Sequence, residues 1–327
     1  MFTLLDEEYK EGSKSFKDYK VVDSLNNETI IPYYVIVGEQ DGPIICITSG
    51  VHGTEYPGIG ANLKLYHDID PKELKGVIIG CPMCNYEAFA QRSMFVNPLD
   101  NKNLNNVFPG NPKGSITEII ADTLLNKFVA AADYHIDMHS GDSIEYLYPY
   151  VFYHKNSCDN RKLDEISRAM AKVYALDYIA VTELAGNGAS DRGNFYSSVS
   201  ELGIPSIQPE IGGVGLIEKK TKLLHYNGVI NVLSHLKMIA ADNTTINANQ
   251  TELVSFYRLH SHNDGVFNAF VEPGQLIKSG DVLANITNYH GDEELEVFKA
   301  TDDGVVLWVM SSLATKKNDT LMAIGTK

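Results

Sequence analysis

The sequence predicts an α/β protein in which helices flank a mixed, largely parallel sheet and a small all-β domain follows. Up to about residue 240, short apolar segments bounded by glycine alternate with amphipathic segments of helical spacing. Beyond that point, short β-like segments follow one another with turn residues between them. The 327 residues suffice for one large and one small domain, and we expect these to be 1–245 and 246–327.

The first elements predict a βαβ unit. The segments GPIICITSG (42–50) and GVIIGCPM (76–83) are apolar and bounded by glycine or a turn, which is typical of buried strands in a parallel sheet. Residues 58–69 between them have the spacing of a helix, which completes the unit.

Strands and helices continue to alternate further along the chain. Ser115 and Glu118 form a capping-box pattern, which marks the start of a helix that runs on through IIADTLLNKFVAAA. A strand at 133–141, a helix at 161–176 and a strand at 204–213 follow. This order is typical of an α/β domain.

The sequence changes character near residue 240. Residues 241–251 are polar and lack periodicity, which indicates a linker or an exposed connection. The segment GVFNAFVEPGQLIKSGDVLANI (265–286) resembles a biotinyl/lipoyl-type barrel. Such carrier domains present a lysine in a Met-Lys or Asp-Lys hairpin, whereas Lys299 here follows YHGDEELEVF. We therefore expect a structural domain that shapes the cleft or a subunit contact, and not an acyl carrier.

Composition and charge disfavour several classes of partner. Hydrophobic residues make up 44% of the chain and charged residues 21%, as in ordinary globular proteins. The formal charge of −15 disfavours binding to nucleic acid, which needs a basic patch, and to anionic membranes.

We find no signal peptide, no apolar run near the ~18 residues of a membrane span, and too few cysteines for a disulfide framework. We expect a cytoplasmic protein that acts on a small molecule, with no nucleic-acid or membrane partner. A homo-oligomer is compatible with these features.

Four polar side chains lie at or just after the carboxyl ends of predicted strands, where functional groups gather in an open α/β sheet. They are His52, Glu55, His139 and Glu210. A catalytic zinc ion commonly takes two histidines and a carboxylate and leaves one position open for water. His52, Glu55 and His139 provide that set, for one Zn²⁺ per chain, and Glu210 would be free to act as general base. His-x-x-Glu alone is also typical of a hydrogen-bonded turn, but the later histidine and glutamate favour the metal site.

Four blocks in this order resemble the succinylglutamate desuccinylase/aspartoacylase family: SGVHGTEYPG, NYEAFAQRSMFVNPLDNKNLNNVFPG, DMHSG and IPSIQPEIGG. The resemblance covers roughly residues 40 to 215, and the β-rich tail also fits the family. It implies a zinc amidohydrolase on a carboxypeptidase-like α/β fold. It also implies that His52, Glu55 and His139 bind zinc and that Glu210 is the catalytic carboxylate.

Two further residues would support this chemistry. The resemblance points to Arg92 as the cation that polarises the scissile carbonyl. A guanidinium beside the metal would stabilise the oxyanion of the tetrahedral intermediate, and losing one such donor typically costs ~3–4 kcal/mol of barrier. The alternative is that Arg92 is a surface cation ahead of a loop. Asp137 shares a strand face with His139 and is a candidate to orient its ring.

One block departs from the family pattern at substrate-binding positions. The family carries an Asn-Arg pair within DLNRVFPG, where this chain has NLNNVFPG. Asn105 matches the first member, Asn106 replaces the arginine, and Asn103 replaces the aspartate. In the family, that arginine binds the free carboxylate of the substrate. An asparagine cannot form such a charged bidentate pair. Either another cation takes over, with Arg192 the nearest candidate in sequence, or the substrate presents no carboxylate there. The other interpretation of Arg192 is a loop residue that pairs with Asp191.

Two smaller motifs have mainly structural interpretations. Cys81 and Cys84 have the spacing of a redox motif, but they follow an apolar strand and no second pair is present, which favours two buried thiols. His260 and His262 alternate near the start of the tail and are better explained as exposed strand residues than as a second metal site.

These observations lead to a zinc-dependent deacylase that cleaves the amide bond of a small N-acylated amino acid or amine through zinc-activated water. Two alternatives remain: a metallocarboxypeptidase that acts on peptides, and a non-catalytic binding protein that keeps the fold. Asn106 disfavours the first alternative. The presence of all three ligands together with Glu210 disfavours the second.

Overall fold

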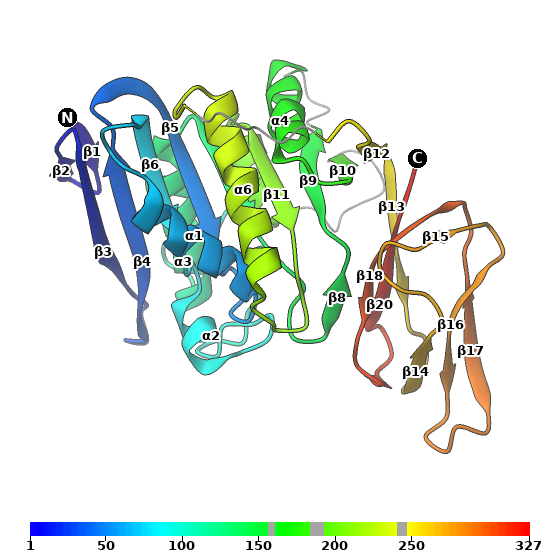
Figure 1. Ribbon diagram of the computed structural model, residues 1–327. Helices are drawn as coiled ribbons and strands as arrows, with labels where there is room; N and C mark the ends of the chain where they lie inside the picture. Colours follow the sequence, from blue (N-terminus) through cyan, green and yellow to red (C-terminus); the bar gives the residue numbers. More distant parts are fainter. Residues whose placement is uncertain (156–160, 184–192, 241–246) are drawn as a thin grey trace.

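The computed structural model describes residues 1–155, 161–183, 193–240 and 247–327. Its larger part has three layers, in which helices cover both faces of a nine-stranded sheet (Figure 1). Arg192 and most of the predicted linker at 241–251 lie outside the described residues. Within those residues, no helix combines the length and the apolar character that crossing a membrane requires.

The sheet is mixed and largely parallel, as the sequence predicts. Its strand order is β12-β10-β9-β11-β7-β5-β6-β4-β3. Neighbouring strands pair antiparallel at β9–β11, β4–β6 and β3–β4 and parallel elsewhere. The strands are β3 (Ser13–Val22), β4 (Glu28–Val37), β5 (Gln40–Ser49), β6 (Lys75–Cys81), β7 (Tyr134–Met138), β9 (Tyr150–Lys155), β10 (Tyr178–Glu183), β11 (Ser206–Glu210) and β12 (Thr251–Leu253). A short hairpin of β1 (Phe2–Leu4) and β2 (Glu7–Tyr9) precedes them.

Each face of the sheet has its own apolar core. Ile45 and Ile47 of β5 face one helix layer, whereas Cys46 between them faces the other, because side chains alternate along a strand. Both cores are fully buried, which explains why the central strands are apolar throughout. The first layer contains α1 (Tyr56–Asp68), α4 (Arg161–Tyr174) and α6 (Lys219–His235); the second contains α3 (Ile116–Thr123) and α5 (Phe195–Glu201).

The predicted capping box is present at the start of α3. Glu118 Oε2 accepts a hydrogen bond from the Ser115 backbone N–H at 2.8 Å. The helix predicted from this signal is not α-helical over its whole length. It continues as a π-helical turn, η2 (Leu124–Phe128), and ends in a 3₁₀ turn, η3 (Val129–Ala131).

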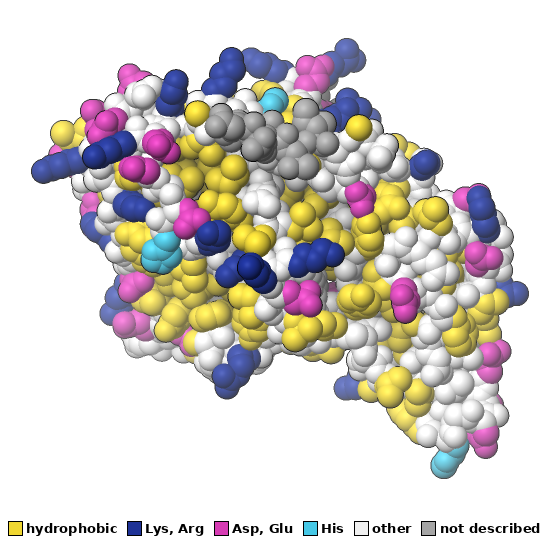
Figure 2. All heavy atoms as spheres, viewed as in Figure 1, with side chains coloured by type: hydrophobic (Ala, Val, Ile, Leu, Met, Phe, Trp, Pro, Cys, Tyr) yellow, Lys and Arg dark blue, Asp and Glu magenta, His cyan; other side chains and the backbone are white. Residues whose placement is uncertain are grey.

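The C-terminal segment consists of strands in the part that the structure describes. One of its sheets has the order β13-β20-β18-β15 and the other β17-β16-β14-β19. It forms a smaller lobe beside the α/β part, as Figures 1 and 2 show. Its strands are β13 (Ser255–His260), β14 (Gly265–Ala269), β15 (Leu276–Ile277), β16 (Val282–Thr287), β17 (Glu294–Lys299), β18 (Gly304–Met310), β19 (Ala314–Thr315) and β20 (Thr320–Thr326).

Two strands connect this lobe to the α/β part. β12 precedes the lobe in the chain but joins the large sheet beside β10. Conversely, β8 (Glu145–Leu147) follows β7 in the chain but pairs with β18 of the lobe, with Leu147 opposite Trp308. The lobe is therefore held against the α/β part by backbone pairing as well as by side chains.

Candidate metal centre

The loop between β5 and α1 presents two of the predicted ligands, and glycine shapes it. Gly50 has a φ of 65°, a left-handed conformation that glycine adopts without strain. At Gly53 a Cβ atom would lie 2.1 Å from the carbonyl carbon of Ala88, so the loop contacts α2 (Tyr86–Gln91) through bare backbone. This close packing places His52 on the loop and Glu55 at the N-terminal end of α1.

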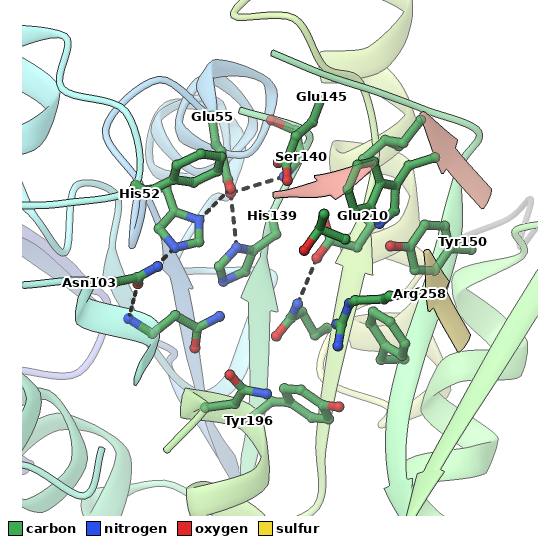
Figure 3. Close-up of a pocket in the computed structure, with 18 of the residues that line it drawn as sticks. His52, Glu55, Asn103, His139, Ser140, Glu145, Tyr150, Tyr196, Glu210 and Arg258 are labelled. Atoms are coloured by element: carbon green, nitrogen blue, oxygen red, sulfur yellow. Dashed lines mark hydrogen bonds and ion pairs between the residues drawn. The ribbon is translucent and has the colours of Figure 1, made fainter. Parts of the chain in front are cut away.

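His52, Glu55 and His139 converge on one point, as the sequence predicts. His52 Nδ1 lies 2.6 Å from Glu55 Oε1, and His139 Nδ1 lies 2.9 Å from Glu55 Oε2 (Figure 3). A ligand atom from each of the three lies within 4.8 Å of the others. His139 follows β7 directly, while His52 and Glu55 follow β5, so the group forms where two adjacent parallel strands end.

Both rings are also held at their far nitrogens. His139 Nε2 lies 3.0 Å from Asp137 Oδ2, which is the contact expected from the shared strand face. His52 Nε2 lies 3.1 Å from Asn103 Oδ1. The two Nδ1 atoms therefore face Glu55, and the two Nε2 atoms face oxygen partners outside the cluster, an arrangement typical of metal-binding histidines.

Charges within the cluster stabilise one another. Burial lowers the pKa of His52, but the Glu55 carboxylate outweighs this effect and raises the pKa to about 9. Burial opposes the charge on Glu55, yet the His139 and His52 rings lower its pKa to about 2. A divalent cation bound by these atoms would displace the ring protons and take over their role in neutralising the carboxylate. Two imidazole nitrogens and one carboxylate, all buried, fit such an ion.

Glu210 lies beside this cluster at the end of β11. Its backbone bridges that of His139, and Figure 3 shows its side chain between the His139 ring and Arg258. Gln208 Nε2 donates a hydrogen bond to Glu210 Oε1 at 2.6 Å. Burial raises the pKa of Glu210 to about 8, against the lowering effect of the His139 charge. A carboxyl group with this pKa can hold and release a proton near neutral pH.

These groups share a cavity of about 250 Å³ that lies between the α/β part and the C-terminal lobe. The α/β part supplies the metal-binding cluster, Glu210 and a set of polar and aromatic side chains, and the lobe supplies Phe256, Arg258, Trp308 and Thr320. The other lining residues are Phe95, Asn103, Asn105, Asn106, Ser140, Glu145, Leu147, Tyr150, Phe152, Thr182, Asn194, Tyr196 and Gln208.

The remaining predicted site residues fall in different places. Asn105 and Asn106 line the cavity; Asn105 Oδ1 accepts a hydrogen bond from the Phe195 backbone N–H at 2.8 Å, and Asn106 is exposed. Arg92 is exposed at the C-terminal end of α2 and does not line the cavity, where Phe95 lies instead. Its role in polarising a carbonyl stays a prediction.

The cavity also contains several residues that were not predicted from the sequence. Gln208 could have been found, because it lies two residues before Glu210 and so on the same face of one strand. Glu145 lines the cavity from β8, and burial raises its pKa to about 7. Arg258 comes from a strand more than a hundred residues after His139 along the chain, and no local pattern links the two.

The cysteine pair and the histidine pair differ in their exposure. Cys81 and Cys84 are fully buried, as expected for structural thiols. His260 is exposed at the end of β13, and His262 lies beyond that strand and pairs with Glu296 at 2.5 Å.

The fold and the site define the class of protein. The chain matches the model of the succinylglutamate desuccinylase/aspartoacylase catalytic domain over residues 41–236 and belongs to this deacylase family. The family resemblance found in the sequence is therefore confirmed.

Particular relatives extend this likeness over most of the chain. The N-alpha-acetyl-L-2,4-diaminobutyric acid deacetylase of Halomonas elongata is 28% identical over 297 residues, which cover 89% of this chain and 84% of that protein. A succinylglutamate desuccinylase from Silicibacter sp. TM1040 has a TM-score of 0.83 at 25% identity, covering 96% of this chain and 94% of that one. The product-bound ectoine utilization protein EutE (DoeB) from Ruegeria pomeroyi shares the fold, with a TM-score of 0.85 at 24% identity over 96% of this chain and 95% of that one.

Proposed function

We propose that this protein is a zinc-dependent deacylase that hydrolyses the amide bond of a small N-acylated amino acid or amine. The principal support is the convergence of His52, Glu55 and His139 beside the separate carboxyl group of Glu210 in one cavity. Two imidazoles and a carboxylate suit Zn²⁺ better than the harder divalent ions, which prefer oxygen ligands throughout. Membership of a deacylase family supports amide hydrolysis as the reaction.

The chemistry divides between the metal and the protein. A zinc ion held by His52, Glu55 and His139 would supply Lewis-acid catalysis and make water acidic enough to ionise near neutral pH. Glu210 would accept the proton of the attacking water at its carboxylate and later donate it to the departing nitrogen. Because Oε1 of Glu210 accepts a hydrogen bond from Gln208, we assign the proton transfer to Oε2.

The size of the cavity favours a small substrate. At about 250 Å³ it accommodates an acylated amino acid, and the aromatic side chains of the C-terminal lobe bound it on one side. The relative from Halomonas elongata is named for an acetylated diamino acid. We therefore propose that an N-acetylated amino acid of similar size is the substrate here.

The domain boundaries, the carboxypeptidase-like fold, the cellular location and the oligomeric state of the protein are further proposals. We infer that residues 1–245 form the hydrolase domain, on a carboxypeptidase-like fold, and that residues 246–327 form an all-β domain bounding its cavity. Cytoplasmic location and homo-oligomer formation remain predictions from the sequence.

The function is tested by replacing the proposed proton carrier. Zinc-loaded protein is assayed for release of amine from Nα-acetyl-L-2,4-diaminobutyrate, N-acetyl-L-aspartate, N-acetyl-1,3-diaminopropane and a short peptide. We expect the wild-type chain to hydrolyse an acetylated amino acid and Glu210→Gln to lose 10²- to 10⁴-fold in kcat, the range typical of general acid–base catalysis. Glu210→Gln should retain its zinc, because this residue is not a ligand. Normal turnover by Glu210→Gln would remove it from the mechanism, and cleavage of the peptide alone would favour a carboxypeptidase.

A further inference from the structure

Arg258 differs from the other basic side chains of the molecule in its surroundings. It is the one lysine or arginine among the described residues that line the cavity. It forms no ion pair with any residue in the described part of the chain, although Glu55, Glu145 and Glu210 line the same cavity. It is also exposed, so that solvent reaches its side chain.

The Arg258 guanidinium lies over the ring of Phe256, which packs into a group of aromatic side chains. Its Cζ lies 5.0 Å from the centroid of the Phe256 ring, two residues earlier on the same face of β13. The Phe256 ring packs edge-on against Phe152 at 5.6 Å, and Phe152 packs against Tyr150 at 5.0 Å. β13 is itself fixed by antiparallel pairing with β20, where Arg258 lies opposite Ala323. The strand and the Phe256 ring thus favour a position of the cation at the cavity.

The position of Arg258 relative to Glu210 suits a substrate that spans the two. Figure 3 shows Arg258 beside Glu210 and Tyr150, on the opposite side of Glu210 from His139. An amide bond placed between the metal-binding cluster and Glu210 would leave one of its two substituents on the side of Arg258. A guanidinium there would favour the substituent that carries a carboxylate. A guanidinium forms two parallel hydrogen bonds with a carboxylate, which neither Asn105 nor Asn106 can do.

We propose that Arg258, supplied by the C-terminal strand β13, binds the free carboxylate of the substrate. The substrate is then an N-acyl amino acid and not an N-acyl amine. The inference rests on the proposed deacylase function. It assigns to the C-terminal lobe the recognition that Asn106 cannot provide.

The test compares two compounds that differ in the carboxylate alone. Nα-acetyl-L-2,4-diaminobutyrate and N-acetyl-1,3-diaminopropane share the same amide and the same second amine. We expect Arg258→Gln to lower kcat/KM for the first compound by about 10- to 100-fold, the range of a lost hydrogen bond to a charged group, and to leave the second within about twofold. Arg258→Lys should recover part of the loss, because it keeps the charge but not the paired hydrogen bonds.

Two controls separate this role from others. Arg161→Gln removes an exposed charge at the start of α4, which does not line the cavity, and should leave both compounds unaffected. The melting temperature of each variant reports whether it folds. An equal loss for both compounds would place Arg258 at the reacting carbonyl instead of the carboxylate. No loss for either would show that it does not contact the substrate, and both results overturn the proposal.

A binding measurement keeps the proposal independent of turnover. On the zinc-loaded Glu210→Gln background, calorimetry gives the Kd of both compounds with and without Arg258→Gln. Preferential binding of the carboxylate compound that disappears with Arg258 would support the proposal, even if the wild-type chain hydrolyses none of the compounds and the proposed function fails. Equal Kd values for the two compounds in the presence of Arg258 would overturn it.

Discussion

Each imidazole of the candidate metal centre is held at both of its nitrogens. For His139 the partners are Glu55 and Asp137, and for His52 they are Glu55 and Asn103. Such contacts fix the orientation of a ring and determine which nitrogen can bind a metal. The fold therefore orders the ligands before the metal binds. Asp137 is completely buried and also accepts a hydrogen bond from Thr48 Oγ1 at 2.7 Å, which limits its own movement.

We predict that Asp137→Asn lowers the affinity for zinc by 10- to 100-fold, because the amide is nearly isosteric but cannot supply the negative charge that raises the basicity of His139. Competition against a chelator of known affinity measures this change. Asp302→Asn, which changes an exposed carboxylate in the C-terminal lobe, should leave the affinity unaltered. Wild-type affinity in Asp137→Asn would mean that the contact does not serve the metal.

Residue types and spacing revealed this part of the site because its members follow strands in one parallel array. Parallel strands bring their carboxyl ends to one edge, so His52, Glu55, His139 and Glu210 could be placed together from the sequence alone. Arg258 could not, because its place beside Glu210 depends on how a separate lobe docks. Nor could sequence place Arg92, whose distance from the cavity depends on the path of the loop after α2.

Among the elements, the close contact between the 50–55 loop and α2 determines where two of the ligands lie. The central strands were predictable because both of their faces are buried, which makes them continuously apolar. The break of α3 into π-helical and 3₁₀ turns was not, because the residues from Leu124 to Ala131 keep an apolar pattern through it. The conformation there is set by packing and not by a local signal.

We predict that Gly53→Ala lowers the free energy of unfolding by ~1–3 kcal/mol, as overpacking typically does, because its Cβ would overlap the backbone of Ala88. Chemical denaturation measures the change. Gly60→Ala is a matched control within α1, where the nearest atoms, at 3.0 Å, are Ile217 Cδ1 and Lys222 Cδ. Both belong to flexible side chains that can move, and alanine favours the helix by up to ~1 kcal/mol, so this variant should be as stable as the wild type or more so. Equal stability of both variants would show that the loop can shift away from α2.

At the scale of the whole molecule, the cavity lies between the α/β part and the C-terminal lobe. β8 of the α/β part pairs with β18 of the lobe, and the lobe contributes four lining residues to the cavity: Phe256, Arg258, Trp308 and Thr320. The sequence predicted the β-rich character of the tail from its turn signals, and it suggested that the tail shapes the cleft. It could not predict the pairing of β8 with β18, because such pairing leaves no periodicity in either segment.

Buried histidines make the stability of the whole chain sensitive to acid. Burial lowers the pKa of His135 to about 4 from an ordinary value of 6.5, and Thr48 and Ser206 hydroxyls contact its ring at 3.0 and 2.8 Å. Between these two pKa values the unfolded chain binds a proton that the folded chain does not. Stability therefore falls as the pH is lowered from about 6.5 to about 4, by up to ~1.4 kcal/mol per pH unit for this residue.

We predict that His135→Gln reduces the slope of unfolding free energy against pH in this window by close to one proton. Urea denaturation of metal-free protein at several values between pH 4.5 and 6 measures the slope, and removing the metal prevents its release from contributing. The absolute stability of the variant can differ without affecting this comparison. An unchanged slope would mean that His135 is not held neutral by the fold.

Metal content per folded chain tests the central claim most directly. Wild-type protein is exposed to excess zinc, freed of unbound ion and analysed by inductively coupled plasma mass spectrometry, beside His52→Ala with its fold checked by circular dichroism. We predict one zinc ion per wild-type chain and a substoichiometric amount in folded His52→Ala. A wild-type chain that retains no zinc, or a His52→Ala chain that retains a full equivalent, would contradict the assignment of His52, Glu55 and His139 as its ligands.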